Sequence, residues 1–286
     1  MSAVAKLASR GITVQQAKDY ILANLNDPVS IFNAAKAVGL TTLMLGEIAG
    51  VPVATVKNYF DANRVDWAKL NPAKTGSVFL TDLSDGDVFL YNPSSQTGKK
   101  IYSFGREITD IAVDEGGNIF VTGFQQLWKY DITDQTLKTL SFHNANLNSL
   151  VVSDNSVVGA SANSNLIYKF DSTSGATVSI EPSFGGASAG DLAYVGNTLF
   201  KASTGSGIVS VQGQTGSNVA ASISSDFWGL VQTPEGNLQA YSNAGNVKNI
   251  NLSTGAVSDF PQVKLVGLGI LSGAAEALDI HLSLFL

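Results

Sequence analysis

Short runs in which apolar and polar positions alternate recur from residue 77 to the end of the chain. One run, residues 107–122, alternates up to the turn Gly116-Gly117-Asn118 and then continues as a second β-rich run, which predicts a hairpin. Its central phrase returns four times, at spacings of 39, 42, 38 and 38 residues between Ile111, Leu150, Leu192, Leu230 and Leu268. A period near forty with several strands per unit is typical of a β-propeller.

A polar turn repeats independently of that phrase. It begins at Asn92, Asp131, Asp171, Gln212 and Asn251. The first turn precedes every copy of the phrase, and the last copy of the phrase follows every turn. This offset predicts a mainly β, five-bladed propeller whose first blade takes its innermost strand from the chain's end. We expect residues 266–271 to pair with residues 77–82, which removes two free sheet edges.

The hairpin and the strand after it also resemble known repeats. Residues 114–121, Asp-Glu-Gly-Gly-Asn-Ile-Phe-Val, precede Leu-Trp-Lys-Tyr-Asp at 127–131. Together they resemble the NHL, SMP-30/gluconolactonase and YVTN propeller repeats, with the likeness extending over residues 77–271. Those families usually have more than five blades. The resemblance implies a propeller and, for the gluconolactonase type, a divalent metal in the central channel held by Glu, Asn and Asp.

Helix-capping residues predict four short helices between residues 13 and 64. Thr13 and Gln16 form a capping box at the start of the first helix, and Asp27 precedes the second. Gly50 ends the third helix, and residues 52–63 form the fourth. We therefore expect a helical bundle over residues 1–70, a propeller over 76–273 and an amphipathic strand or tail over 274–286.

Residues 46–56 of this bundle resemble a helix-turn-helix. DNA binding would direct one set of residues to the groove: Pro52, Ala54, Thr55, Lys57 and Asn58. Residues 1–74 hold 8 basic and 5 acidic residues, and the remainder holds 9 and 18. This asymmetry is mild, so we favour a packing role for the turn. The module also resembles leaders of bacterial secreted proteins.

Composition narrows the classes of function. The net charge of −6 argues against nucleic acid and anionic membranes as partners. The absence of cysteine excludes disulfides, thiolate metal sites and cysteine nucleophiles. No apolar run reaches the length of a membrane span, and residues 1–12 lack the apolar region of a Sec signal.

Candidate catalytic chemistry is sparse. The two histidines, His143 and His281, neighbour no nucleophile, and we expect His143 to be solvated in a loop. The predicted inner strands carry one polar residue each as candidate ligands for a hard cation such as Ca²⁺: Asp110, Asn148, Asp191 and Asp226. Such residues more often end turns and bond backbone amides. We therefore expect no catalytic residue, metal or cofactor.

Two further segments are candidates for binding. Phe227 and Trp228 begin a predicted inner strand near the channel mouth or a blade junction. Trp228 could stack on a sugar there, although a structural role is the interpretation that we favour. In the tail, the alternation over residues 280–286 predicts a strand with one apolar face. Its acidic residue followed by terminal hydrophobic residues resembles the uncleaved C-terminal signals of type I secreted bacterial proteins. We expect this tail to act in assembly or secretion, through Asp279, Ile280, Leu282, Leu284, Phe285 and Leu286.

Three functions follow from these features. The favoured one is a non-catalytic, secreted or cell-surface protein that binds protein or glycan and self-associates. The first alternative is a propeller enzyme of lactonase or lyase type with a metal at the channel mouth. The second is a cytoplasmic regulator that binds DNA through the helical module.

Overall fold

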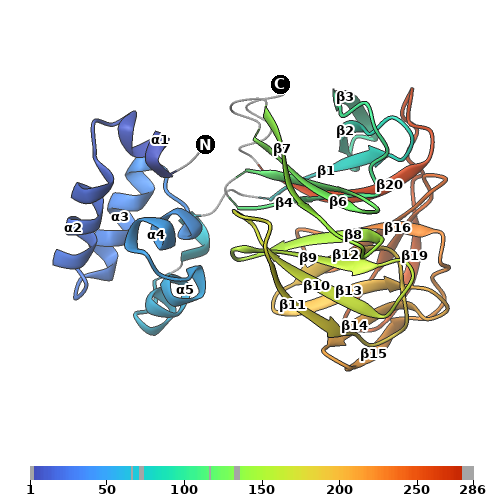
Figure 1. The fold of residues 1–286 in the computed structure, drawn as a ribbon. Coiled ribbons are helices and arrows are strands. Elements are labelled where there is room, and N and C mark those ends of the chain that lie inside the picture. The colour runs from blue at the N-terminus through green and yellow to red at the C-terminus, as the bar shows by residue number, and fades with distance from the viewer. Residues whose placement is uncertain (1–2, 66, 71–73, 116, 132–135, 279–286) are drawn as a thin grey trace.

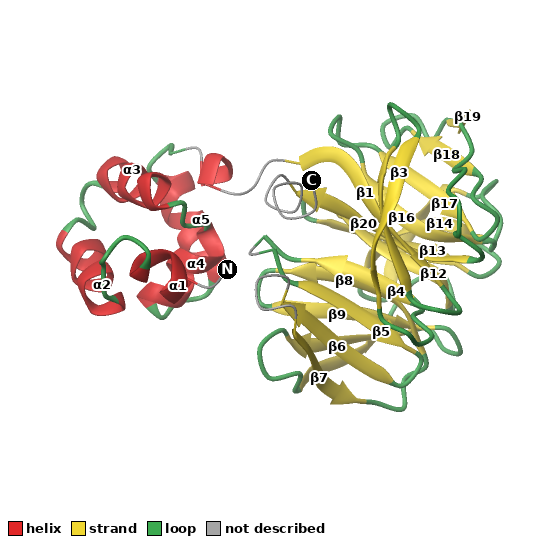
Figure 2. Cartoon of the chain, turned by 90° about the horizontal axis from the view of Figure 1, so that it is seen from above, coloured by secondary structure: helices red, strands yellow, loops and turns green. Residues whose placement is uncertain are grey.

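The structure is a computed structural model that describes residues 3–65, 67–70, 74–115, 117–131 and 136–278. The described residues form a group of short helices followed by five four-stranded sheets. Figures 1 and 2 show the helices together on one side of the ring of sheets. This arrangement confirms a mainly β, five-bladed propeller with a small N-terminal helical domain.

The helical domain consists of α1 (Ala3–Ala8), α2 (Val14–Ala23), α3 (Pro28–Val38), α4 (Thr42–Ala49), α5 (Val53–Ala62) and the 3-10 helix η1 (Trp67–Leu70). The predicted capping box of Thr13 and Gln16 is present at α2. Gly50 ends α4 in the left-handed conformation. The sequence patterns missed α1 and η1, because each is too short to show a helical period. Leu7 and Leu70 from these two elements are nevertheless buried in the core of the domain.

Each blade is an antiparallel sheet, and its strands follow one another in order from the centre of the ring to the outer edge. The first blade contains β1 (Lys74–Asp82), β2 (Asp87–Asn92) and β3 (Thr97–Ser103), and the second β4 (Asp110–Val113), β5 (Ile119–Gly123), β6 (Gln126–Asp131) and β7 (Thr136–Phe142). The third contains β8 (Leu147–Ser153), β9 (Ser156–Ser161), β10 (Leu166–Asp171) and β11 (Thr177–Pro182). The fourth contains β12 (Ser188–Val195), β13 (Thr198–Ser203), β14 (Gly207–Gln212) and β15 (Thr215–Ala220), and the fifth β16 (Phe227–Gln232), β17 (Leu238–Ser242), β18 (Val247–Ile250) and β19 (Val257–Phe260).

The ring closes as predicted in principle, but through a later segment. The innermost strand of the first blade is β20 (Leu271–Leu278), which pairs antiparallel with β1. The predicted closing strand, residues 266–271, was wrong, because most of it forms turns and a bend and Val266 is fully exposed. Residues 274–278, assigned to a tail by the sequence, therefore belong to the propeller.

The reason for this error is crowding at the centre of the ring. A Cβ on Gly273 would lie 2.1 Å from Asp110 Oδ1, and one on Gly229 would lie 2.7 Å from Ala274 Cβ. The closing strand therefore carries Gly and Ala in place of large apolar residues, so it lacks the alternation that marks the other strands. The phrase around Leu268 has that alternation without being a strand.

Separate apolar clusters hold neighbouring blades together. Phe79 and Ile111 meet in the cluster between the first two blades, and Phe120 and Phe170 meet in the next. Tyr91 and Tyr241 share the cluster at the closure between blades five and one. Apolar side chains from neighbouring blades therefore pack against each other at these positions.

The helical domain contacts the hairpin turns at one end of the ring. Thr42 Oγ1 donates a hydrogen bond of 3.2 Å to Glu115 Oε2. Lys57 Nζ lies 3.5 Å from Glu115 Oε1 and 3.4 Å from Asp154 Oδ1. Because Glu115 follows β4 and Asp154 lies between β8 and β9, helices α4 and α5 face the second and third blades. No single described helix is long and apolar enough to span a membrane. Helices α3 and α4 meet these criteria only when taken together, and the chain bends by 110° between them.

Candidate functional site

Two aspartates meet at the centre of the ring, each fully buried. Asp110 accepts hydrogen bonds from the N–H groups of Ile111 and Leu150. Asp191 accepts from the N–H groups of Leu192, Leu230 and Ala274. These five donors come from β4, β8, β12, β16 and β20, one from each blade. Four copies of the repeated phrase thus each supply one amide of this ring, and β20 supplies the fifth, and the two carboxyl groups accept from all five.

The two carboxyl groups also bond to each other. Burial raises the pKa of Asp110 well above its usual range, and the neighbouring Asp191 charge raises it further. Burial likewise raises the pKa of Asp191, although its hydrogen bonds to Asp110 and to backbone amides favour its charged form. Asp110 therefore holds the proton and donates it to the Asp191 carboxylate. This pair binds backbone amides, which is the structural role that the sequence favoured for these residues.

The other two candidate metal ligands lie elsewhere. Asn148 Nδ2 donates to the Ser188 carbonyl at 3.2 Å, and Asp226 is exposed in the loop before β16. The residues at the central positions of the third and fifth inner strands are Ser149 and Gly229 instead. Within the described residues, no group of three His, Cys, Asp or Glu side chains has the arrangement of a metal site.

The candidate binding aromatics pack within the protein. Phe227 is 6 % exposed and lies in the apolar cluster between the fourth and fifth blades. The half-buried Trp228 packs against Gly190, where an added Cβ would lie 2.5 Å from the Trp228 Cα. Its indole N–H donates to the Ser225 carbonyl at 3.1 Å. Both side chains therefore pack at the junction between the fourth and fifth blades, which is the structural alternative that the sequence favoured for Trp228.

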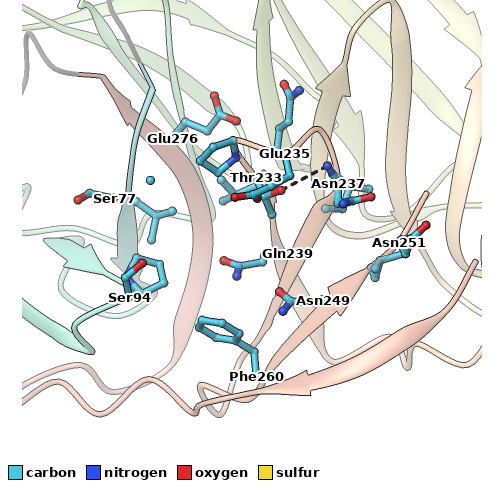
Figure 3. A pocket seen from close by; sticks show the side chains of 18 of the residues that line it. Ser77, Ser94, Thr233, Glu235, Asn237, Gln239, Asn249, Asn251, Phe260 and Glu276 are labelled. Atoms are coloured by element: carbon cyan, nitrogen blue, oxygen red, sulfur yellow. Dashed lines mark hydrogen bonds between the residues drawn. The ribbon is translucent and has the colours of Figure 1, made fainter. Parts of the chain in front are cut away.

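A polar groove of about 550 Å³ lies where the ring closes, between the first and fifth blades. We call it the closure groove. Ser77 and Ser94 line the first-blade wall, and residues of β16 to β19 line the other. Figure 3 shows Gln239 and Asn249 next to Phe260 in this space, with Glu235 and Glu276 further along.

A cross-strand row of polar side chains forms the floor of the closure groove. Gln239 on β17 pairs directly with Asn249 on β18, which pairs with Ser258 on β19. Tyr241 Oη donates to Gln239 Oε1 at 2.7 Å, which leaves the Gln239 amide donors directed away from Tyr241. Asn249 Oδ1 is buried and accepts no hydrogen bond from the described protein. Because an unpaired buried acceptor is costly, this row is suited to a ligand that supplies hydroxyl groups.

A second cavity, of about 830 Å³, lies at the mouth of the channel beneath the helical domain. Inner-strand residues from all five blades line it, and Lys36 of α3 and Lys69 of η1 complete the wall. The helix-turn-helix-like segment is involved in the same contact. Lys57, the basic residue among those predicted to face DNA, lies beside Glu115 and Asp154 instead. Ile48 and Val56 of the segment are buried in the core of the helical domain, which is the packing role that the sequence favoured for the turn.

A buried lysine on β13 has no counterpart among the residues predicted from the sequence. Lys201 on β13 is 1 % exposed, and its Nζ donates to Ser183 Oγ and to the Gly186 carbonyl, each at 2.6 Å. Burial lowers the pKa of Lys201 to about 8. Serine beside such a lysine is a known nucleophile–base pair. Ser183 is also buried, and neither residue lines any cavity identified in the described structure, so the pair joins the third blade to the fourth.

His143 is not solvated, contrary to the prediction from the sequence. Both ring nitrogens are buried without a hydrogen-bond partner, and the ring lies 5.6 Å from that of Phe170. Burial lowers the pKa of His143 to about 4. The imidazole is therefore neutral and packs as an aromatic ring. His281 and the predicted assembly residues of the tail, 279–286, lie outside the described residues.

Comparisons with known proteins found solved structures of low similarity. No family model matches the chain, and no curated protein matches it. One similar solved chain comes from the mitotic checkpoint complex, with 14% identity, a TM-score of 0.43, and coverage of 65% of this chain and 60% of that one. Another comes from a nidogen/laminin complex, with 14% identity, a TM-score of 0.47, and coverage of 72% and 82%.

A third similar chain is a protein of unknown function from Bacteroides caccae. It is 9% identical, with a TM-score of 0.44 and coverage of 68% of this chain and 77% of that chain. The chain therefore spans less than two thirds of the first of these structures and somewhat more of the other two. The likeness to NHL, SMP-30/gluconolactonase and YVTN repeats holds at the level of the propeller fold, which the strand order itself establishes.

Proposed function

We propose that this chain is a non-catalytic binding protein whose propeller holds a saccharide in the closure groove. The observation that carries the proposal is the row of Gln239, Asn249 and Ser258, in which a buried amide oxygen has no partner. Sugar hydroxyls both donate and accept hydrogen bonds, as such a mixed row requires. The adjacent ring of Phe260 offers an apolar face for the C–H groups of a sugar.

The chemistry of the groove supports binding rather than catalysis. Its two carboxylates, Glu235 and Glu276, lie among amides and hydroxyls, and no histidine or lysine is among the described residues that line it. The buried Asp110 and Asp191 carboxyls lie at the ring centre and do not line the groove. A general base must reach the proton that it removes, and neither carboxyl of the buried pair meets this condition.

A secreted or surface location, by a type I route with a C-terminal signal, is part of the same proposal. The loops are rich in Ser, Asn and Gly, and the chain has no cysteine. Appending residues 274–286 to an unrelated reporter, in a strain that carries a type I exporter, tests this point. Export of the reporter supports the proposal, and retention in the cell contradicts it.

Titration calorimetry with cellohexaose, chitohexaose and maltohexaose tests the binding function. Replacing Gln239 and Asn249 together by leucine removes the polar row while keeping side-chain volume. We expect this variant to weaken binding of the preferred oligosaccharide at least about tenfold, or about 1.4 kcal/mol. Asn155→Ala, an exposed position outside the groove, is the control. Unchanged affinity in the leucine variant, or no binding of any saccharide by the wild type, contradicts the proposal.

A further inference from the structure

A pocket of about 590 Å³ in the second blade has the features of a separate ligand site. Phe124 and Phe142, which line it, are 42% and 74% exposed. Among the described residues of the propeller, they are the two aromatic side chains that are largely exposed. Exposed aromatic rings gathered at one pocket are unusual for a surface that contacts only water.

The polar side chains between these rings are available for a ligand. Gln125 and Asn144 are exposed, as is the carboxylate of Glu107. None of the three makes a side-chain hydrogen bond or ion pair within the described protein, so their donors and acceptors face solvent. The pocket therefore alternates apolar ring faces with unpaired polar groups.

Backbone hydrogen bonds hold the two segments that carry the rings next to each other. His143 N donates to the Gln125 carbonyl at 2.9 Å, and Leu147 N donates to the Phe124 carbonyl at 3.0 Å. Phe142 is the cross-strand partner of Gln126 at the start of β6. Because these bonds join the β5–β6 turn to the segment after β7, the site is formed before a ligand arrives. A preformed site loses little conformational entropy on binding.

We propose that this pocket, which we call the aromatic site, is a second saccharide site in which sugar rings stack on Phe142 and Phe124. The C–H face of a pyranose packs on an aromatic ring, while its hydroxyls reach the amides of Gln125 and Asn144 and the Glu107 carboxylate. The class of ligand rests on the proposed function, but the site does not. It lies at the β5–β6 end of the second blade, whereas the closure groove lies at the β16–β17 end of the fifth.

The test uses the Gln239→Leu/Asn249→Leu protein as background, so that the closure groove no longer contributes. With each of the three hexasaccharides, we expect residual binding in which the ring current shifts pyranose C–H proton resonances upfield. Adding Phe142→Ala is expected to raise Kd about tenfold and remove the shift, while Phe142→Trp retains both. Ile180→Ala, at an exposed apolar position on β11, is the control and is expected to leave Kd unchanged.

The outcomes separate the two sites. If Phe142→Ala binds all three hexasaccharides as its background does, or if the background binds none, the aromatic site is wrong. If a decaproline peptide binds there and no saccharide does, the pocket recognises a polypeptide and the proposal is equally wrong. If Phe142→Ala abolishes binding while the leucine substitutions change nothing, the aromatic site stands and the closure groove is wrong.

Discussion

The buried carboxyl pair allows a stability prediction to be worked from named contacts. Replacing Asp110 by alanine leaves the N–H groups of Ile111 and Leu150 without their acceptor and removes the donor to Asp191. Each buried donor left unpaired costs about 1–3 kcal/mol. The change also removes the cost of burying one carboxyl, so we expect a net loss of about 2–4 kcal/mol.

Urea unfolding, followed by circular dichroism and tryptophan fluorescence, measures this loss. The free energy of unfolding of a typical domain is about 5–15 kcal/mol, so the variant should remain folded but unfold at a clearly lower urea concentration. Asp226→Ala is the control, because that side chain is exposed, and its effect is expected to stay within about 0.5 kcal/mol. A loss below about 1 kcal/mol for Asp110→Ala would refute the view that this residue joins the blades.

The same pair predicts a pH dependence. A carboxyl whose pKa is higher in the folded than in the unfolded state binds its proton more tightly when folded, so stability falls as pH rises through the folded pKa. The pKa values of Asp110 and Asp191 are both raised. Asp110→Asn removes one of these titrations, so its stability should fall less than that of the wild type as pH rises above about 4, the ordinary pKa of a carboxyl group. Parallel curves for the two proteins would contradict the assignment.

Three further predictions follow from individual side chains and segments. The pKa of His143 is lowered to about 4, so the unfolded protein binds a proton at this residue first and stability falls as pH drops below about 6.5. In urea titrations at different pH values, His143→Phe should make that fall in stability less steep. An unchanged slope would show that the ring is solvated. Lys57→Ala should lower the free energy of unfolding by at most about 1 kcal/mol, because its ion pairs with Glu115 and Asp154 are partly exposed. The same variant should raise hydrogen exchange in the turns that carry these two acidic residues. Lys18→Ala is the control, and equal exchange in both variants would argue against contact between the helical domain and the propeller. Deleting residues 279–286 should leave the ring folded and abolish export or self-association, whereas a variant that is exported and elutes at the wild-type size with a lower melting temperature would assign the tail to internal packing.

Much of the fold is encoded locally and could therefore be predicted from the sequence. The Asx turns at Asn92, Asp171 and Asn251 and the capping box at Thr13 depend on residues within four positions of one another. The period near forty follows because each blade repeats one strand–turn unit. Five blades and a closure between the chain's end and β1 follow from counting these units.

The functional surfaces and the closing strand required the tertiary structure. Asp110 and Asp191 were identified as central, but only the assembled ring shows that their carboxyl groups bond to each other and to five amides from different blades. The unpaired state of Asn249 depends on what lies opposite it, and Lys201 is buried by contacts with another blade. Sequence patterns report alternation along one strand. Burial, crowding at Gly273 and the partners of a side chain arise between strands that are distant in the chain, so only the folded ring determines them.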